Sequence, residues 1–230
     1  MFLNIQDKGK IMQKICFLAS GNGGHFKFLY LLKKMGIINN IKLFVIADRE
    51  CGSIKFAKNN NIYCKIINYS KKNNIELLRR LNEINPNVII TNWHKIIDEQ
   101  TVKLYKGKMI NLHYSLLPAF SGLIGIKPIK KAFEQNSQYI GATCHYVDEG
   151  VDTGKIISQY CLKKENIEIK QAIQYIFQGS NLILLNTLIK KFDIEVTIKK
   201  IKNDKYEYSP SLEFDDEIFN KNFWERLKSL

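Results

Sequence analysis

The feature that most limits the fold is an alternation, over the first half of the chain, of short apolar runs with amphipathic stretches. Runs rich in β-branched and aromatic residues, typical of buried strands, occupy residues 14–19, 41–47, 63–67, 88–91 and 109–112. Helical patterns separate them at residues 26–35, 53–60, 75–84 and 99–105. Strands that alternate with helices form a parallel sheet covered on both faces. We therefore predict an α/β fold with a doubly wound, mostly parallel sheet.

The pattern changes after residue 126. A helical stretch at residues 126–135 is followed by two strand-like runs, at residues 139–147 and 155–162, which a glycine-containing loop joins without a helix. Strands joined in this way pair in the antiparallel sense, so we predict an antiparallel ribbon on this side of the sheet. A long helix at residues 168–191 follows.

The C-terminal segment, residues 195–230, has a different character. It contains a strand-like run at residues 195–201, a turn at Asn203-Asp204 and an amphipathic stretch at residues 219–227. Its aromatic side chains suit docking on the rest of the chain: Phe214, Phe219, Phe223 and Trp224. We therefore divide the chain into an N-terminal extension (residues 1–11), a main domain (residues 12–194) and a C-terminal extension (residues 195–230) that packs on it.

The chain is strongly basic. With 35 Lys and Arg against 22 Asp and Glu, its formal net charge is +13. Such a charge can serve a nucleic acid, an anionic substrate or neither. A nucleic-acid-binding surface needs clustered Arg and aromatic residues, whereas the lysines here are spread along the whole chain. We therefore expect small-molecule substrates and no nucleic-acid partner.

Three absences define the cellular setting that we expect. No apolar run approaches the roughly 20 residues that cross a bilayer. Residues 1–11 lack the features of a secretory signal. The 5 cysteines are scattered and include no CxxC pair, which favours reduced thiols and no metal site. We expect a cytoplasmic protein with no membrane partner and no bound metal.

A glycine-rich loop follows the first predicted strand. It consists of Ser20, Gly21, Asn22, Gly23 and Gly24. Small residues there let backbone N–H groups approach an anion at the positive end of the following helix. The loop is not a dinucleotide fingerprint, because Phe26 stands where a third glycine is required, and no GK[ST] ending makes it a P-loop. A tight strand-to-helix turn also accounts for these residues.

Two polar side chains of the fifth predicted strand point to the same face. Asn111 and His113 are two residues apart, so their side chains project together. A carboxamide and an imidazole are donors that suit an oxygen gaining negative charge in a tetrahedral intermediate. Asp152, in the acidic loop at residues 144–154, is the candidate carboxylate beside them. Such a carboxylate would raise the pKa of His113 above its usual value of about 6.5 and order water for proton transfer. Taken singly, these residues also fit ordinary polar contacts.

These segments occur together in a recognisable order. SGNGG, then NLHYSLLPAFSG, then HYVDEGVDTGKII resembles the 10-formyltetrahydrofolate-dependent formyltransferases, especially the glycinamide ribonucleotide transformylase branch, over residues 14–192. The resemblance implies the Rossmann-like formyltransferase fold and a catalytic trio of Asn111, His113 and Asp152. In that mechanism an amine attacks the formyl carbon of N10-formyltetrahydrofolate. Asn111 and His113 stabilise the oxyanion, and Asp152 supports His113 and proton transfer.

The resemblance also implies where the two substrates bind. The folate co-substrate would lie against two loops, formed by Trp93, His94, Lys95, Ile96 and Ile97 and by Val147, Asp148 and Glu149. The acceptor would contact Ser20, Gly21, Asn22, Gly23 and Gly24, together with Tyr114 and Gln178. Trp93 also suits an aromatic core, and His25 and His94 suit either a ligand contact or solvent. We expect His145 to be structural.

The acceptor is where the sequence departs from the purine-pathway enzymes. Those enzymes carry an EHxxYP-like stretch on a later helix, whereas residues 178–183 here are QGSNLI. Tyr114 also replaces the proline after His113, and the aromatic C-terminal extension is closer to the sugar N-formyltransferases. We therefore favour a nucleotide-linked amino sugar, such as a dTDP-4-amino-4,6-dideoxyhexose, used for surface polysaccharides such as the lipopolysaccharide O-antigen. The alternative is a phosphoribosylglycinamide formyltransferase of purine biosynthesis.

Two further activities use the same trio. Methionyl-tRNA formylation would come with a large carboxy-terminal tRNA-binding domain, and hydrolysis of the formyl folate would come with an extra amino-terminal regulatory domain. The sequence argues against both. Exposed aromatic side chains of the C-terminal extension would suit a homodimer contact.

Overall fold

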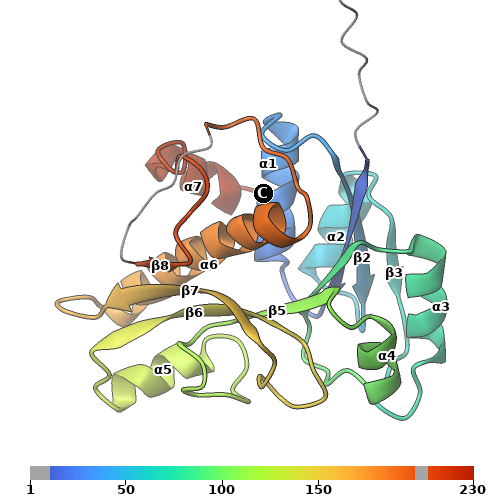
Figure 1. Cartoon of the computed structure of the whole chain (residues 1–230), viewed down its shortest axis with the longest axis horizontal. Coiled ribbons are helices and arrows are strands. Elements are labelled where there is room, and N and C mark those ends of the chain that lie inside the picture. The colour runs from blue at the N-terminus through green and yellow to red at the C-terminus, as the bar shows by residue number, and fades with distance from the viewer. Residues whose placement is uncertain (1–10, 200–206) are drawn as a thin grey trace, which may run out of the picture.

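The computed structural model describes residues 11–199 and 207–230, and these form a sheet covered by helices on both faces (Figure 1). The strands are β1 (Gln13–Ala19), β2 (Ile41–Ala47), β3 (Cys64–Ile66), β4 (Val88–Asn92), β5 (Met109–His113), β6 (Tyr139–Tyr146), β7 (Ile156–Lys163) and β8 (Tyr208–Ser209). The helices are α1 (Gly24–Lys34), α2 (Gly52–Asn59), α3 (Ile75–Ile84), α4 (Glu99–Leu104), α5 (Lys127–Glu134), α6 (Ile169–Lys191) and α7 (Lys221–Lys228). No helix of this described part is long and apolar enough to cross a membrane.

Strand β1 lies inside the sheet, between β2 and β4, and is buried on both faces. Because side chains alternate along a strand, Ile15 and Phe17 enter one hydrophobic core, which includes side chains of α1, α6 and α7. Cys16 and Leu18 enter a second core, which includes side chains of α3 and α4. Two cores of this kind require an apolar strand without alternating polar residues, and this is the sequence pattern of β1.

The sheet order is β3-β2-β1-β4-β5-β6-β7-β8. Strands β1 to β5 pair in parallel. The chain first moves outward from β1 to β3 and then returns to place β4 on the other side of β1. The carboxyl ends of β1 and β4 therefore flank a topological switch point, which is where open α/β sheets bind ligands. The predicted doubly wound, mostly parallel fold is confirmed.

The last three strands form the predicted antiparallel part. β6 pairs antiparallel with both β5 and β7, and β8 extends the sheet along β7. The register places Asn111 opposite His145 and His113 opposite Thr143. This pairing brings side chains from the second half of the chain to the functional end of β5.

Helix α6 lies close to β7 because of one glycine. A Cβ atom at Gly179 would stand 2.1 Å from Cδ1 of Tyr160, so only glycine lets that ring approach the helix backbone so closely. The helix begins with a capping box in which the side chains of Glu168 and Gln171 each bond to the other residue's backbone.

The described part of the C-terminal segment packs on α1. The rings of Phe219, Phe223 and Trp224 lie 6.0, 5.9 and 6.1 Å from the ring of Phe28, centroid to centroid. All four side chains are buried. The expectation that these aromatic side chains are exposed is therefore wrong, because they pack against α1, and a homodimer stays a prediction.

Two other expectations about the ends of the chain need comment. The predicted strand at residues 195–201 is not formed over its described part, where only an isolated bridge joins Val196 to Ile38. The rest of that run and the turn at Asn203-Asp204 lie outside the described residues, as does nearly all of the N-terminal extension. The three domain boundaries stay a prediction.

Candidate active site

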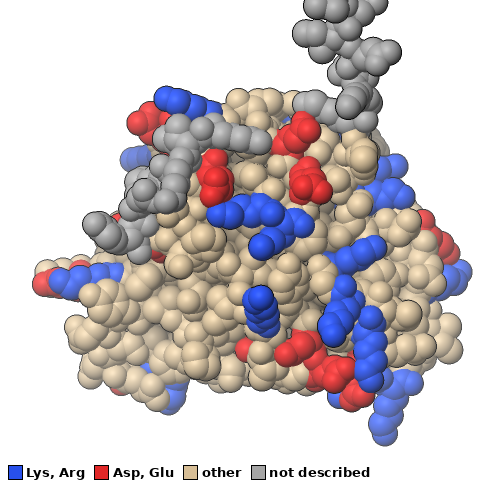
Figure 2. Space-filling model, in the orientation of Figure 1, with Lys and Arg blue, Asp and Glu red and all other residues tan. Residues whose placement is uncertain are grey.

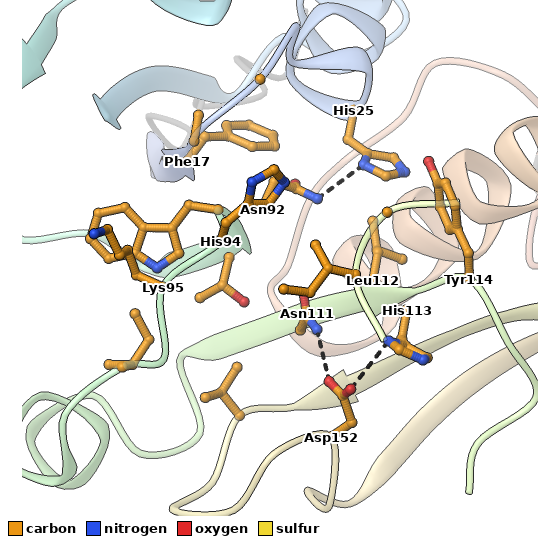
Figure 3. Close-up of a pocket in the computed structure, with 18 of the residues that line it drawn as sticks. Phe17, His25, Asn92, His94, Lys95, Asn111, Leu112, His113, Tyr114 and Asp152 are labelled. Carbon is orange, nitrogen blue, oxygen red and sulfur yellow. Dashed lines mark hydrogen bonds and ion pairs between the residues drawn. The ribbon is translucent and has the colours of Figure 1, made fainter. Parts of the chain in front are cut away.

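A cavity of about 460 Å³ opens beyond the carboxyl ends of β1, β4 and β5, at the topological switch point (Figure 3). Four segments that the sequence singled out reach it: the glycine-rich loop, the loop after β4, the end of β5 and the acidic loop after β6. A fifth segment, residues 122–125, also lines it. The fold thus gathers residues that lie more than a hundred positions apart.

The three residues of the predicted trio converge at one side of this cavity. Asp152 stands between the other two: its Oδ2 is 3.3 Å from Nδ1 of His113, and its Oδ1 accepts a hydrogen bond of 3.4 Å from Nδ2 of Asn111 (Figure 3). Asn111 and His113 leave the same face of β5, as their spacing predicts. All three side chains line the cavity.

Asp152 is held as an anion by its surroundings. Burial alone would raise its pKa, but hydrogen bonds from His145 and from the Gly122 N–H, with the charges of His113 and His145, bring the pKa below its ordinary value. The bond from the Gly122 N–H to Oδ2 measures 2.8 Å. Asp152 itself has φ of 57°, a left-handed conformation that Asp tolerates better than most residues.

The pKa of His113 differs from the expectation. Burial lowers its pKa below the ordinary value, and this outweighs the opposing effects of the Asp152 charge and of the Phe120 carbonyl, which lies 3.1 Å from Nε2. The expectation that the pKa of His113 lies above its usual value is therefore wrong: Asp152 raises it as expected, but the ring is only 5% exposed and burial lowers it further.

One residue of this centre was not predicted. His145 was expected to be structural, yet its Nε2 lies 3.3 Å from Nδ2 of Asn111 and 3.6 Å from Oδ1 of Asp152. Its Nδ1 is 2.9 Å from the Tyr146 carbonyl, so Nδ1 carries a proton that it donates to that oxygen. The antiparallel register that sets His145 opposite Asn111 is the signal that identifies it, and that register is not readable from the sequence.

Most of the predicted folate-binding residues line the same cavity. Seven of them line it: Trp93, His94, Lys95, Ile96, Ile97, Val147 and Asp148. Glu149 does not, because it is exposed and lies 3.7 Å from Lys103 outside the cavity. Trp93 combines both expected roles, since its buried ring stacks on Tyr69 with centroids 4.9 Å apart and also lines the cavity.

The predicted acceptor-binding residues are only partly brought together. Gly21, Asn22, Gly23, Gly24 and Tyr114 line the cavity. Ser20 does not, because its hydroxyl donates to Asp48 at 2.8 Å and accepts from the His94 N–H at 3.0 Å, joining two loops from behind. Gln178 lies on α6 away from the lining, where Phe177 instead covers the backbone of Gly24.

The loop at residues 119–126 was recognised only as part of a motif. Leu123, Ile124 and Gly125 line the cavity, and the loop carries the Phe120 carbonyl and the Gly122 N–H that contact His113 and Asp152. It follows β5 directly, so its proximity to the trio was the available signal. In residues 11–199 and 207–230, no group of three or more His, Cys, Asp or Glu side chains is placed to hold a metal ion.

Comparisons with known proteins identify the family to which the chain belongs. A family model described as formyl transferase matches residues 13–172. The phosphoribosylglycinamide formyltransferase of Bacillus subtilis is 31% identical over 172 residues, covering 71% of this chain and 86% of the relative. The chloroplastic enzyme of the same name from Arabidopsis thaliana is 29% identical over 161 residues, covering 66% of this chain and 55% of the relative.

A solved structure shows the same fold. The phosphoribosylglycinamide formyltransferase of Bacillus halodurans superposes with a TM-score of 0.70 at 27% identity, covering 77% of this chain and 94% of that one. The chain spans about half the length of the two plant relatives that it matches, 55% of one and 50% of the other. None of these relatives is named for a sugar acceptor, so the amino-sugar interpretation gains no support from them.

Proposed function

Because the chain belongs to the formyl transferase family, we propose that it transfers the formyl group of N10-formyltetrahydrofolate to the primary amine of phosphoribosylglycinamide. The observation that carries the reaction class is the convergence of Asn111, His113 and Asp152 in one cavity at the switch point. The acceptor is assigned by similarity, since the 31% identical relative from Bacillus subtilis is named for it. This replaces the amino sugar as the first candidate.

The residues present suit a folate on the side of the cavity formed by the loops after β4 and β6. Trp93, Ile97 and Val147 offer apolar surface for a flat ring, and the polypeptide backbone of the two loops offers polar groups for its edge. His94 and Lys95 are exposed at the same side, where a negatively charged glutamate tail would reach solvent. Folate is a co-substrate in this proposal, and no metal takes part.

The reaction is a formyl transfer between two nitrogens. The amine lone pair attacks the formyl carbon, a C–N bond forms, and the carbonyl oxygen gains negative charge. Asn111 and His113 donate hydrogen bonds to that oxygen. Collapse of the intermediate breaks the bond to N10, and the proton lost by the amine is delivered to N10.

Asp152 couples the proton to the oxyanion. As an anion it accepts the amine's proton, and it also holds the side chains of Asn111 and His113 by hydrogen bonds. Once protonated, it accepts more weakly, so both donors are released toward the oxyanion at the stage when they are needed. His113 donates to the oxyanion from a ring N–H that Asp152 orients beforehand.

A second candidate acceptor remains, and one observation favours it. The acceptor side of the cavity is lined by Tyr114, and Gln178, which stands at the position of the glutamate in the purine-pathway motif, is away from the lining. A nucleotide-linked amino sugar is therefore the second candidate. Both candidates have a primary amine, so the trio serves them alike.

The test is a comparison of acceptors. The protein is incubated with N10-formyltetrahydrofolate and, separately, phosphoribosylglycinamide, dTDP-linked and UDP-linked amino sugars, and release of tetrahydrofolate and the formylated product are measured. We expect the highest kcat/KM with phosphoribosylglycinamide. If only an amino sugar is formylated, the acceptor assignment is wrong and the reaction class stands. If no amine is formylated, the proposed function is wrong.

A further inference from the structure

A hydrogen-bonded chain of three side chains borders the cavity beside the glycine-rich loop. His25 lies in the first turn of α1, Asn92 at the end of β4 and Ser180 in α6. Nε2 of His25 is 3.0 Å from Oγ of Ser180. Nδ1 of His25 is 3.3 Å from Nδ2 of Asn92, the contact marked in Figure 3. His25 and Asn92 line the cavity, while Ser180 is fully buried behind them.

The donor in each bond can be assigned. The hydroxyl of Ser180 donates to the carbonyl of Phe177 at 2.7 Å, so its oxygen is left to accept from Nε2 of His25. Nδ1 of His25 then holds a lone pair, which accepts from the amide N–H of Asn92. This assignment needs a neutral imidazole. Burial lowers the pKa of His25 to about 4, which keeps the imidazole neutral.

The consequence is a fixed orientation for the Asn92 carboxamide. Its nitrogen is directed to His25, so its carbonyl oxygen is turned the other way. That oxygen is buried and has no hydrogen-bond partner within residues 11–199 and 207–230. A buried polar atom without a partner is costly, and in an active site it is the kind of atom that a substrate donor satisfies.

The chain of side chains lies on the acceptor side of the trio. Thr91 pairs with Asn111 between β4 and β5, so Asn92 directly follows the neighbour of Asn111. The ring of His25 meets the ring of Tyr114 edge-on, with centroids 6.1 Å apart. Figure 3 shows His25 and Tyr114 on one side of Asn111, and His94 and Lys95 on the other.

This side of the cavity is uncharged. Among the described residues that line the whole cavity, the Lys and Asp side chains are Lys95, Asp148 and Asp152. Asp152 belongs to the trio, the other two lie on the folate side, and His25 is neutral. A group of the acceptor that reaches Asn92 is therefore recognised by neutral hydrogen bonding. An unpartnered carbonyl oxygen binds an N–H or an O–H donor.

We propose that Asn92, oriented by His25 and Ser180, determines acceptor specificity by accepting a hydrogen bond from an uncharged donor that neighbours the reacting amine. This inference rests on the proposed formyl transfer and deepens it. The substrate class is an amine that carries an amide N–H or a hydroxyl close to the amino group. Asn92 contacts the substrate, and His25 is a positioning residue that acts through Asn92.

The experiment separates acceptor binding from folate binding and from folding. Asn92→Ala removes the carbonyl oxygen, and His25→Phe removes the group that orients it. His25→Gln keeps one hydrogen-bond donor and one acceptor in the side chain. Asn186→Ala and Ser158→Ala are matched controls, because both residues are buried and hydrogen-bonded but lie outside the cavity lining. For each protein we measure kcat and KM with phosphoribosylglycinamide as the acceptor, and the Kd for tetrahydrofolate.

We expect Asn92→Ala and His25→Phe to raise the acceptor KM about fivefold to tenfold, with the tetrahydrofolate Kd unchanged. His25→Gln should restore most of the acceptor affinity, and the two controls should leave the acceptor KM at the wild-type value. Ser180→Ala, which leaves both lining side chains in place, is the second variant if His25→Phe does not fold, and it should raise the acceptor KM in the same direction.

Three results would overturn the inference. The first is an acceptor KM within twofold of wild type in Asn92→Ala. The second is an equal weakening of acceptor and tetrahydrofolate, which would indicate a structural role. The third is a wild-type protein that formylates no amine at all, which would remove the proposed function as well. If the wild type formylates the acceptor and the variants have an unchanged acceptor KM, the inference is wrong but the proposed function stands.

Discussion

At the scale of single residues, the centre is a closed network around Asp152. The N–H groups of Asn111 are directed to Asp152 and to His145, and both ring nitrogens of His113 face acceptors, Asp152 and the Phe120 carbonyl. A network in which every donor has a partner is ordered before the substrate arrives, which is the condition for electrostatic stabilisation of an oxyanion.

Replacing the donors tests their part in the reaction. Asn111→Ala and His113→Ala should each lower kcat by about 10² to 10³, because each removes one hydrogen bond to the oxyanion. The measurement is the steady-state rate of tetrahydrofolate release with saturating acceptor. Tyr139→Ala, an exposed residue of β6 far from the cavity lining, is the control. A kcat within a few-fold of wild type in both variants would be incompatible with the assigned role.

The buried His25 gives a prediction about stability and pH. Its pKa is about 4 in the folded protein against 6.5 in an unfolded chain, so at intermediate pH the unfolded state binds the extra proton. Stability from this residue is full above pH 6.5 and is lost as pH falls toward 4. We expect the free energy of unfolding to drop by about 2 kcal/mol from this residue between pH 7 and pH 5.

Urea unfolding of the wild type and His25→Gln at the two pH values measures that contribution. The variant should lose about 2 kcal/mol less stability than the wild type over the same interval. His113, whose pKa is also lowered, contributes to both proteins and cancels in the comparison. Equal pH dependence in the two proteins would show that His25 is not buried as a neutral side chain.

At the residue scale, the sequence predicted relations between residues that are close along the chain, but not contacts between residues that are distant along it. The spacing of Asn111 and His113 on one strand is enough to predict their common face, and both line the cavity. His145 and Asn92 reach the centre through strand pairing, whose register depends on the whole sheet. The pKa of His113 was predicted in the wrong direction because its sign depends on burial, which a sequence motif does not contain.

At the scale of elements, the alternation of apolar runs and helical patterns was sufficient to predict most of the sheet. The predicted strand at residues 41–47 and the helix at residues 75–84 have the bounds that the structure shows, because both have unambiguous periodicity and flanking breakers. The strand expected at residues 195–201 failed, because its β-branched side chains find only a single bridge to Ile38. Intrinsic strand preference needs a pairing partner to be realised.

The contact of α7 with α1 is an element-scale feature that can be tested. Trp224 is 7% exposed and stacks on Phe28. Trp224→Ala should lower the free energy of unfolding by about 3 to 5 kcal/mol, because it leaves a cavity in an aromatic cluster. Leu104→Ala, on a side chain that is 63% exposed, is the control and should change stability by less than about 0.5 kcal/mol. Equal stability of Trp224→Ala and wild type in urea would contradict this packing.

At the scale of the whole molecule, the net charge of +13 is not concentrated at the cavity. Figure 2 shows Lys and Arg side chains spread over the visible face, with acidic side chains between them. Lys95 is the one lysine among the described lining residues. The excess positive charge therefore acts on anionic substrates mainly from a distance. Salt weakens this attraction, because the screening length is about 10 Å at 0.1 M ionic strength.

This distribution predicts a small and specific salt effect. Lys95→Gln should raise KM for the folate up to about fivefold at low ionic strength, and the difference from wild type should shrink as salt is added. Lys170→Gln, an exposed residue of α6 outside the cavity lining, is the control and should leave KM unchanged. A folate KM that responds equally to both substitutions would assign the effect to net charge instead of to Lys95.

The account depends most on one reaction, formyl transfer to an amine through Asp152. The decisive measurement follows a ¹³C-labelled formyl group from N10-formyltetrahydrofolate by NMR in the presence of phosphoribosylglycinamide, for the wild type and for Asp152→Asn. We predict that the wild type transfers the label to the formamide product and that Asp152→Asn forms this product at least about 10² times more slowly. Label that stays on the folate, or equal rates for the two proteins, would contradict the account.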